Sequence, residues 1–368
     1  MFTADDHRYM ARALRLAERG LYTTDPNPRV GCVLVLDGAV VGEGWHERAG
    51  CPHAEIAALR QAGEQAVGAT AYVTLEPCCH QGRTPPCTDA LIKAGVEQVV
   101  AAMKDPNPQV AGNGLRRLQE AGLKVQVGLL AAEAERLNPG FVMRMRQGRP
   151  WVRCKLAMSL DGRTAMASGE SQWITGSEAR RDVQRLRARS SAIMSGIGTV
   201  LTDDPSLTVR LEHEAGDQLR QPLRVVLDSR LRLSPQARLL GLPGETLIIT
   251  GEDDTERKDR LACKDMSVIT LPLVDGRLEL SAVMRYLGGM EINEVHVESG
   301  ATLSGALLQA RLVDELVVYL APHLMGDTAR GLFSLPGLEQ MDERIALSIS
   351  DIRAVGRDWR ITATVNLV

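Results

Sequence analysis

Two stretches within the first hundred residues carry side chains that can bind a metal ion. His53 is followed two residues later by Glu55, and Cys78 and Cys87 come further along the chain. Imidazole and thiolate groups are common zinc ligands. A structural zinc site normally has four protein ligands, whereas a hydrolytic site has three and keeps one position for water. Three ligands with a carboxylate nearby therefore predict a hydrolytic zinc site.

In such a site, Glu55 is the residue expected to move protons. Zinc lowers the pKa of a bound water, and a nearby carboxylate can take up the proton and return it to a leaving group. His-x-Glu followed by Pro-Cys-x-x-Cys is typical of zinc deaminases acting on cytosine or adenine. Here eight residues separate Cys78 from Cys87 instead of two. The alternative is that the cysteines are packing residues and that His53 is a surface residue. This alternative explains each residue taken alone, but it explains the ordered set poorly.

Three secondary-structure elements must bring these ligands together. A proline precedes His53 and two prolines precede Cys87, so both ligands are expected where helices begin. Inside a helix, His53 and Glu55 would diverge by about 200°, but they can converge at a helix start. A buried strand over 70–75 is expected to end shortly before Cys78. The predicted site therefore combines two helix starts with one strand end.

Length and composition predict a two-domain protein. The 368 residues exceed the usual size of one domain, and the basic stretch 144–150 is the expected linker, so we predict domains over 1–147 and 148–368. Seven scattered cysteines, an N-terminus without a signal-peptide pattern and no apolar run of about 20 residues favour a cytoplasmic protein that is not in a membrane. A net charge of −3 and 3% aromatic residues argue against nucleic-acid binding.

Both halves alternate helices with strands, which predicts an α/β fold with a helix-covered sheet in each. In the first half, helices are expected at 6–19, from 54, 87–94 and 112–121, and strands at 31–36, 39–42, 70–75, 97–102 and 124–128. In the second half, strands are expected at 151–157, 191–195, 222–228, 246–250, 293–298 and 315–321, and helices at 177–189, 281–288 and 302–311. Glycine-bearing turns at 195–199 and 297–306 would let backbone N–H groups approach a phosphate, although such glycines more often only make tight turns.

Four segments resemble the bifunctional riboflavin biosynthesis deaminase-reductases: TDPNPRVG at 24–31, HAE at 53–55, TLEPCCHQGRTPPC at 74–87 and KLAMSLDGRTA at 155–165. The resemblance covers essentially the whole chain. It implies a cytidine-deaminase-like mixed-sheet domain that hydrolytically deaminates a pyrimidine ribotide, 2,5-diamino-6-(5-phosphoribosylamino)pyrimidin-4-one. It also implies a dihydrofolate-reductase-like α/β domain that uses NADPH to reduce the ribosyl group to ribityl, and a homodimer.

The resemblance also implies roles for individual residues. The zinc ligands would be His53, Cys78 and Cys87, with Glu55 as proton shuttle, and Asn27 and His80 would be weaker candidates for ribotide contacts. The cofactor positions would be Ala157, Trp173, Thr199, Asp203, Ser229, Gly300, Ala301, Thr302, Leu303, Ser304, Gly305 and Ala306. The substrate positions would be Ser171, Arg187, Leu207, Arg210 and Glu298.

Several residues keep an ordinary structural interpretation. Without the resemblance, Arg187 would be an exposed charge on its helix, and Trp173 a core residue. The group that supplies a proton in the reduction stays open between Lys155, Asp161 and a water.

Two other functions remain as alternatives. One is a nucleic-acid-editing zinc deaminase with an accessory binding domain. The other is a zinc-stabilised regulatory module fused to a nucleotide sensor, without catalysis.

Overall fold

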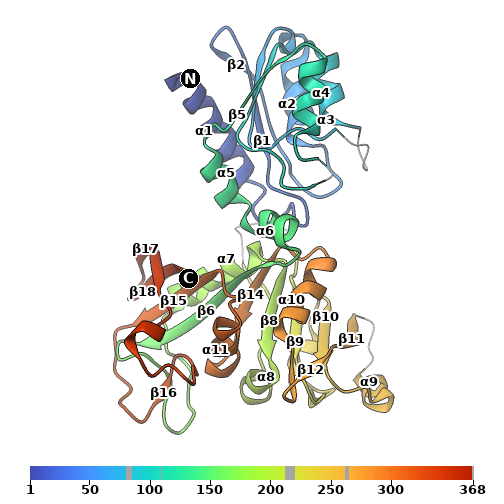
Figure 1. Ribbon diagram of the computed structural model, residues 1–368. Coiled ribbons are helices and arrows are strands. Elements are labelled where there is room, and N and C mark those ends of the chain that lie inside the picture. Colours follow the sequence, from blue (N-terminus) through green and yellow to red (C-terminus); the bar gives the residue numbers. More distant parts are fainter. Residues whose placement is uncertain (80–84, 109, 212–219, 262–264, 367–368) are drawn as a thin grey trace. The chain divides into compact units, whose positions relative to one another are not determined.

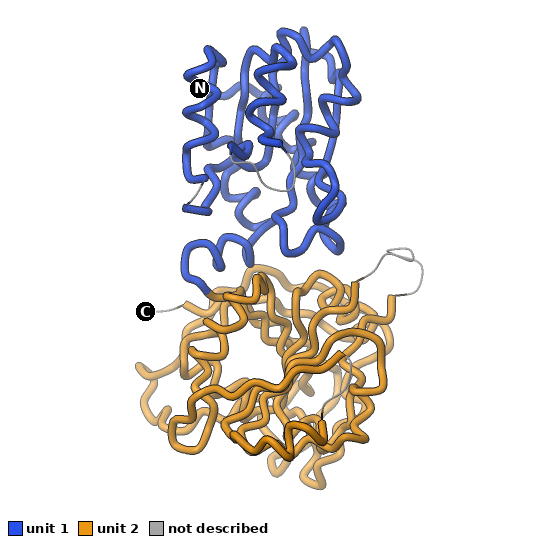
Figure 2. The backbone as a smooth tube through the Cα atoms, turned by 90° about the vertical axis from the view of Figure 1, so that its right-hand side faces the viewer, with its two compact units in different colours: residues 1–148 blue, residues 149–368 orange. Residues whose placement is uncertain are grey.

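The computed structural model describes residues 1–79, 85–108, 110–211, 220–261 and 265–366. The chain divides into two compact units, residues 1–148 and 149–368, shown in different colours in Figure 2. His80, one of the candidate ribotide contacts, lies outside the described residues. A search of the described helices finds none with the length and apolar character needed to span a membrane.

The described part of the first unit contains a mixed sheet with the strand order β2-β1-β3-β4-β5. Its strands are β1 (Gly31–Leu36), β2 (Ala39–Trp45), β3 (Thr70–Val73), β4 (Gln98–Ala101) and β5 (Lys124–Val127). β1 is antiparallel to β2 and β3, whereas β3, β4 and β5 are parallel. Asp37 and Gly38 join β1 to β2 with φ angles of 49° and 79°, as a two-residue hairpin turn requires.

Helices cover both faces of this sheet (Figure 1). One face carries α2 (Ala54–Ala62), α3 (Cys87–Lys93) and α4 (Asn113–Glu120), and a short 3-10 turn (Gly63–Ala66) follows α2. The other face carries α1 (Ala4–Glu18), α5 (Ala131–Leu137) and α6 (Pro139–Gln147). Gly44 of β2 lets α2 approach closely, because a Cβ there would lie 2.3 Å from the Ala54 carbonyl oxygen. The start of α2 is thereby held against the sheet.

The expected linker over 144–150 is wrong for most of its length. Residues 139–147 form α6, which ends at Gly148 with a φ of 69°. The helix buries Phe141 and Val142, and Arg144 and Arg146 lie in its last turn. Basic side chains near a helix C-terminus interact favourably with the helix dipole. The basic residues of this stretch therefore mark the end of a helix and not a solvated linker.

The segment before β1 is fastened to the end of α5. The side chain of Asn138 accepts a hydrogen bond from the Arg29 backbone N–H at 2.8 Å and donates one to the Arg29 carbonyl oxygen at 2.9 Å. The Arg29 guanidinium donates to the Leu137 carbonyl oxygen at 2.8 Å. These contacts fix the backbone that leads from Asn27 into β1.

The described part of the second unit is built on a sheet with the order β11-β10-β9-β8-β14-β6-β15-β18-β17. The parallel strands are β6 (Trp151–Ser159), β8 (Ala192–Gly196), β9 (Leu223–Leu227), β10 (Thr246–Thr250), β11 (Met266–Thr270), β14 (Glu294–Glu298) and β15 (Glu315–Ala321). The hairpin β17 (Leu347–Val355) and β18 (Asp358–Val365) is antiparallel and completes one edge. Short pairs join β7 (Arg163–Ala165) to β16 (Arg330–Gly331) and β12 (Leu273–Val274) to β13 (Arg277–Leu278).

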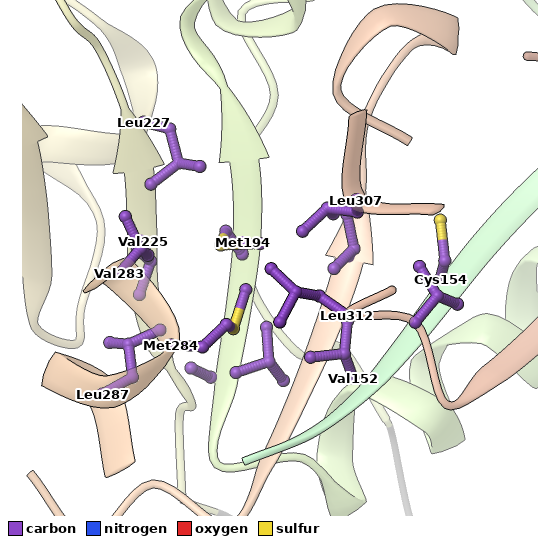
Figure 3. Packing of buried hydrophobic residues seen from close by; sticks show 14 of the residues in the cluster. Val152, Cys154, Met194, Val225, Leu227, Val283, Met284, Leu287, Leu307 and Leu312 are labelled. Atoms are coloured by element: carbon purple, nitrogen blue, oxygen red, sulfur yellow. The ribbon is translucent and has the colours of Figure 1, made fainter. Parts of the chain in front are cut away.

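Helices again pack on both faces. α10 (Leu280–Gly289) and α11 (Ala301–Gln309) cover the main core, and the other face carries α7 (Ser177–Arg189), α8 (Ile197–Asp203) and α9 (Thr255–Leu261). Figure 3 shows side chains of the main core from the sheet, α10 and the α11 region: Val152, Cys154, Met194, Val225, Leu227, Val283, Met284, Leu287, Leu307 and Leu312. The predicted helix-covered α/β fold is thus confirmed in both halves, whereas the β17–β18 hairpin was not expected from the sequence.

Candidate active sites

His53, Cys78 and Cys87 converge in the first unit. Among the described residues they form the cluster of potential metal ligands, with their ligand atoms within 4.8 Å of one another. His53 Nδ1 lies 3.2 Å from Cys87 Sγ and 3.6 Å from Cys78 Sγ. His53 is the N-cap of α2, and Cys87 is the first residue of α3. The helix starts predicted from the prolines are therefore present.

Backbone contacts join Cys78 to the start of α3. The Cys87 N–H points at Cys78 Sγ over 3.4 Å, and the Thr88 N–H donates to the Cys78 carbonyl oxygen at 3.2 Å. Hydrogen bonds from the side chains of Cys87 and His53 lower the pKa of Cys78, although burial opposes this shift. A thiolate is the form that binds metal. The cluster is thus prepared to hold a cation.

Glu55 lies in the first turn of α2 and is buried, with 3% of its surface exposed. Burial, reinforced by the charge of Cys78, raises the pKa of Glu55 to about 7. A carboxyl group with a pKa near neutrality can both accept and return a proton. Two thiols, one imidazole and a neighbouring buried carboxyl fit a hydrolytic zinc site with a Cys₂His ligand set.

His46, which the sequence interpretation missed, lies beside the cluster. Its ring packs edge-on against that of His53, with centroids 5.4 Å apart, and only 3% of its surface is exposed. Its Nδ1 lies 3.2 Å from the Pro52 carbonyl oxygen, and its Nε2 lies 3.0 Å from Asn27 Nδ2. Burial lowers the pKa of His46, so the neutral ring donates from Nδ1 and accepts from Asn27. In the sequence, the signal that could have identified His46 is its position just after the β1–β2 hairpin.

The glycine-bearing turns of the second unit lie side by side. β8 leads into α8, β14 leads into α11, and these two strands are neighbours in the sheet. The Gly300 N–H donates to Thr199 Oγ1 at 3.3 Å, which joins the two turns. Ligands of open α/β sheets bind at the carboxyl ends of parallel strands. The geometry therefore fits a cofactor phosphate at the Gly300 turn.

The remaining predicted cofactor positions are more dispersed. Ser304 and Gly305 are buried, and a Cβ at Gly305 would lie 2.0 Å from the Ser334 carbonyl oxygen, so both serve the packing of α11. Ser229 follows β9, where its hydroxyl accepts from the Leu278 N–H at 3.3 Å. Asp203 ends α8 and is exposed. Ala301, Thr302, Leu303 and Ala306 lie on α11, and Ala157 lies on β6.

Trp173 is not a core residue, which corrects its ordinary structural interpretation. The side chain is 68% exposed, and the Arg180 guanidinium lies 4.7 Å from its ring centroid. This is a cation–π contact on the surface of the second unit.

Arg187 is buried and paired, so the interpretation as an exposed charge is wrong. Its Nε and Nη2 donate to the Glu298 carboxylate at 2.5 and 2.8 Å, and its Nη1 donates to the Thr208 carbonyl oxygen at 2.7 Å. The structure thus brings two predicted substrate positions together as an ion pair. Of the others, Leu207 is buried, Ser171 is half-buried and Arg210 is exposed.

Lys155 lies beside this ion pair. It is half-buried and faces Glu298 in the parallel register of β6 and β14. Burial lowers the pKa of Lys155. Burial opposes ionisation of Glu298, but Arg187 outweighs it and holds the pKa of Glu298 well below its usual range. A lysine with a lowered pKa can release a proton more readily.

The carboxylate of Asp161 is hydrogen-bonded to the loop that contains Met325 and Gly326. Its carboxylate accepts from the Ser159 hydroxyl, from the Met325 N–H at 3.1 Å and from the Gly326 N–H at 2.8 Å. These hydrogen bonds, that of Ser159 above all, lower the pKa of Asp161 to about 2. It is therefore ionised near neutral pH and poorly suited to donate a proton, which leaves Lys155 and a water.

Comparisons with known proteins find a family match in each unit. Residues 3–103 match the cytidine and deoxycytidylate deaminase zinc-binding region, and residues 150–361 match the RibD C-terminal domain. The chain is 57% identical over 362 residues to riboflavin biosynthesis protein RibD of Escherichia coli K12, covering 96% of this chain and 97% of that protein. It is 52% identical over 372 residues to the RibD protein of Haemophilus influenzae, covering 99% and 98%.

Solved structures show the same similarity. Acinetobacter baumannii RibD superposes with a TM-score of 0.91 at 47% identity, with 99% of each chain covered. A diaminohydroxyphosphoribosylaminopyrimidine deaminase/5-amino-6-(5-phosphoribosylamino)uracil reductase from Thermotoga maritima superposes with a TM-score of 0.86 at 32% identity, covering 98% of this chain and 99% of that one.

Proposed function

Because the chain belongs to the RibD family of riboflavin biosynthesis proteins, we propose that residues 1–148 carry its deaminase activity and residues 149–368 its reductase activity. The protein is a bifunctional riboflavin biosynthesis enzyme with a zinc-dependent deaminase and an NADPH-dependent reductase. The zinc-binding family match falls in the first unit and the RibD C-terminal match in the second. This full-length membership disfavours a nucleic-acid-editing enzyme and a non-catalytic sensor.

In the first reaction, water replaces the 2-amino group of 2,5-diamino-6-(5-phosphoribosylamino)pyrimidin-4-one, and ammonia leaves. Zinc, when held by His53, Cys78 and Cys87, supplies a water of lowered pKa. Glu55 would take one proton from the attacking water and pass it to the ring nitrogen, then take a second from the hydroxyl of the adduct and pass it to the departing amine. Its pKa of about 7 suits both transfers. Asn27, whose amide is hydrogen-bonded to His46, would contact the ribotide. The observation that carries this assignment is the ligand trio with a buried carboxyl beside it.

In the second reaction, the ribosyl C1′, in an opened carbonyl-like or imine-like form, is reduced. NADPH, when bound, supplies the hydride. Lys155 donates the accompanying proton, Arg187 holds Glu298 and the Thr208 backbone in place, and the exposed Arg210 binds the ribose phosphate. The turn at Gly300 and Thr199 holds the cofactor phosphate.

Zinc removal tests the division of labour between the units. The purified protein is assayed with the pyrimidine ribotide, and ammonia release and NADPH oxidation are followed separately. Chelation should abolish ammonia release, whereas NADPH oxidation with the already deaminated ribotide should be retained, because the ligands lie in the first unit only. Loss of both activities on chelation, with the second unit still folded, would contradict the assignment.

We also propose that the enzyme is a homodimer that uses the β17–β18 hairpin. Leu347, Ile349, Ile352 and Trp359 are between 46% and 59% exposed. A register shift between Ile349 and Asp351 places Ile349, paired with Ala363, on the same face as Ile352, paired with Ile361. Apolar side chains thus gather on one face at a sheet edge, and such patches are typical of protein interfaces. Because one hairpin offers this face in every copy, a two-fold contact between copies would cover it.

Charged substitutions in the hairpin test the dimer. Ile349→Lys with Ile352→Lys should lower the solution mass from two chains to one, because each buried isoleucine contributes roughly 1.5–3 kcal/mol. Val274→Lys, at an apolar residue of β12 that is 57% exposed, is the matched control and should leave the mass unchanged. Light scattering distinguishes the states, and a double variant that keeps the wild-type mass would exclude this surface.

The thiols support a location in a reducing compartment. Cysteines of the described chain are free, and two of them belong to the ligand trio. Thiols persist in a reducing compartment. We therefore propose a cytoplasmic enzyme.

A further inference from the structure

Glu76, two residues before Cys78, has a buried carboxylate with four backbone partners. Its Oε2 accepts from the Asp105 N–H at 3.1 Å and the Gly112 N–H at 2.9 Å. Its Oε1 accepts from the Gly114 N–H at 2.9 Å and the Leu115 N–H at 3.3 Å. Only 3% of the surface of Glu76 is exposed. Each carboxylate oxygen therefore binds a pair of N–H groups and has no need of water.

These bonds fasten the loop after β3 to the start of α4. The first N–H groups of a helix lack partners within the helix, and α4 has no side-chain cap from its own N-cap residue, Gly112. Glu76 provides that cap from a distant part of the chain. The carboxylate thus determines where residues 76–78 lie relative to α4.

A second contact acts on the residue between Glu76 and Cys78. Gly114 of α4 packs directly against the Pro77 carbonyl oxygen, and a Cβ at Gly114 would lie 2.1 Å from that oxygen. Main chain and side chain of the same segment are therefore both held against one helix turn. Cys78 follows immediately and is joined to the start of α3 through its carbonyl oxygen.

We propose that Glu76 is a positioning residue for the zinc site, with Gly114 as the surface on which the Pro77–Cys78 peptide rests. The inference rests on the proposed ligand role of Cys78. Glu76 would act by fixing the direction of the Cys78 thiolate, without touching metal or substrate. Residues that orient metal ligands typically change metal affinity 10–100-fold when they are replaced.

Two substitutions test this role from opposite sides of the contact. Glu76→Gln keeps the shape but turns an NH₂ group toward one pair of backbone N–H donors. Gly114→Ala keeps the carboxylate but pushes the Pro77 carbonyl away. In the full-length protein, both should weaken zinc affinity by about 10–100-fold and shift the thiolate-to-metal absorption of the Co²⁺-substituted enzyme. Reductase activity should be retained.

Two controls separate positioning from general stability. Gly122→Ala strains the far end of α4, where φ is 90° and a Cβ would meet no heavy atom of the described chain within 4 Å. Tyr72→Phe removes a hydrogen bond to Asp6 on the opposite face of the sheet. Both should keep wild-type zinc affinity and Co²⁺ absorption, even where thermal unfolding of the metal-free protein shows them destabilised.

The outcomes are distinct. Wild-type zinc affinity and absorption in Glu76→Gln and Gly114→Ala would overturn the inference, and so would equal losses in the two controls. If Glu76→Gln does not fold, Gly114→Ala decides alone. A wild-type protein that binds neither zinc nor Co²⁺ would instead overturn the proposed ligand set.

Discussion

Glu55→Gln should abolish ammonia release while zinc stays bound. The amide has nearly the same shape as the carboxylate but cannot take up a proton, and Glu55 lies outside the ligand trio. General acid–base catalysis typically contributes about 10²–10⁴-fold, so the deamination rate should fall by at least that factor. Ammonia release and zinc content are measured on the same sample, together with NADPH oxidation on the deaminated ribotide.

The reductase activity of the same enzyme is the control for this prediction. Reductase activity should not change, because Glu55 belongs to the first unit. Near-normal deamination by the Gln variant would show that the proton role is wrongly assigned. Loss of zinc together with activity would show that Glu55 acts on the metal site and not on the protons.

Lys155→Met should abolish the reduction and leave deamination intact. Methionine keeps most of the apolar stem but removes the only Lys155 group that can donate a proton. The expected fall in the rate of NADPH oxidation is again about 10²–10⁴-fold. Lys155→Arg adds a sharper comparison, because a guanidinium keeps the charge but does not release its proton in proteins. If only charge matters, the Arg variant retains the reduction.

The pH dependence of the reductase gives an independent measure. Burial lowers the pKa of Lys155, and the donor is its protonated form, so the wild-type rate should fall as pH rises through that lowered pKa. Lys155→Met should lose this alkaline decline in its residual rate. Asp161→Asn is the matched control, because its carboxylate is committed to the backbone of Met325 and Gly326, and the alkaline decline should persist there. An unchanged rate in Lys155→Met would leave water as the donor.

The cluster of candidate zinc ligands was largely predictable from the sequence because its signals are local. Prolines mark the starts of α2 and α3, and residue types identify His53, Cys78 and Cys87 as candidate ligands. Helix propensity and side-chain chemistry depend on a few adjacent residues, so both can be inferred from the sequence without knowledge of the fold.

Contacts between distant segments were not predictable in this way. Arg187 and Glu298 are 111 residues apart, and nothing in either neighbourhood indicates that they pair. Glu76 depends on backbone groups about 30–40 residues away. The interpretation of 144–150 as a linker failed for a similar reason, since the burial of Phe141 and Val142 depends on a sheet formed much earlier in the chain.

The bonds between Asn138 and Arg29 bear on how far a separate deaminase would have to extend. The zinc-binding family match ends at residue 103. The backbone of Arg29, which leads from Asn27 into β1, is nevertheless hydrogen-bonded to the side chain of Asn138, 35 residues beyond that point. A fragment cut at the end of the match would retain the three candidate metal ligands and lose the hydrogen bonds between Asn138 and Arg29. An autonomous version of the first activity must therefore extend at least to Asn138. Because Phe141 and Val142 of α6 pack in the same core as α1 and α5, its end is expected near residue 148.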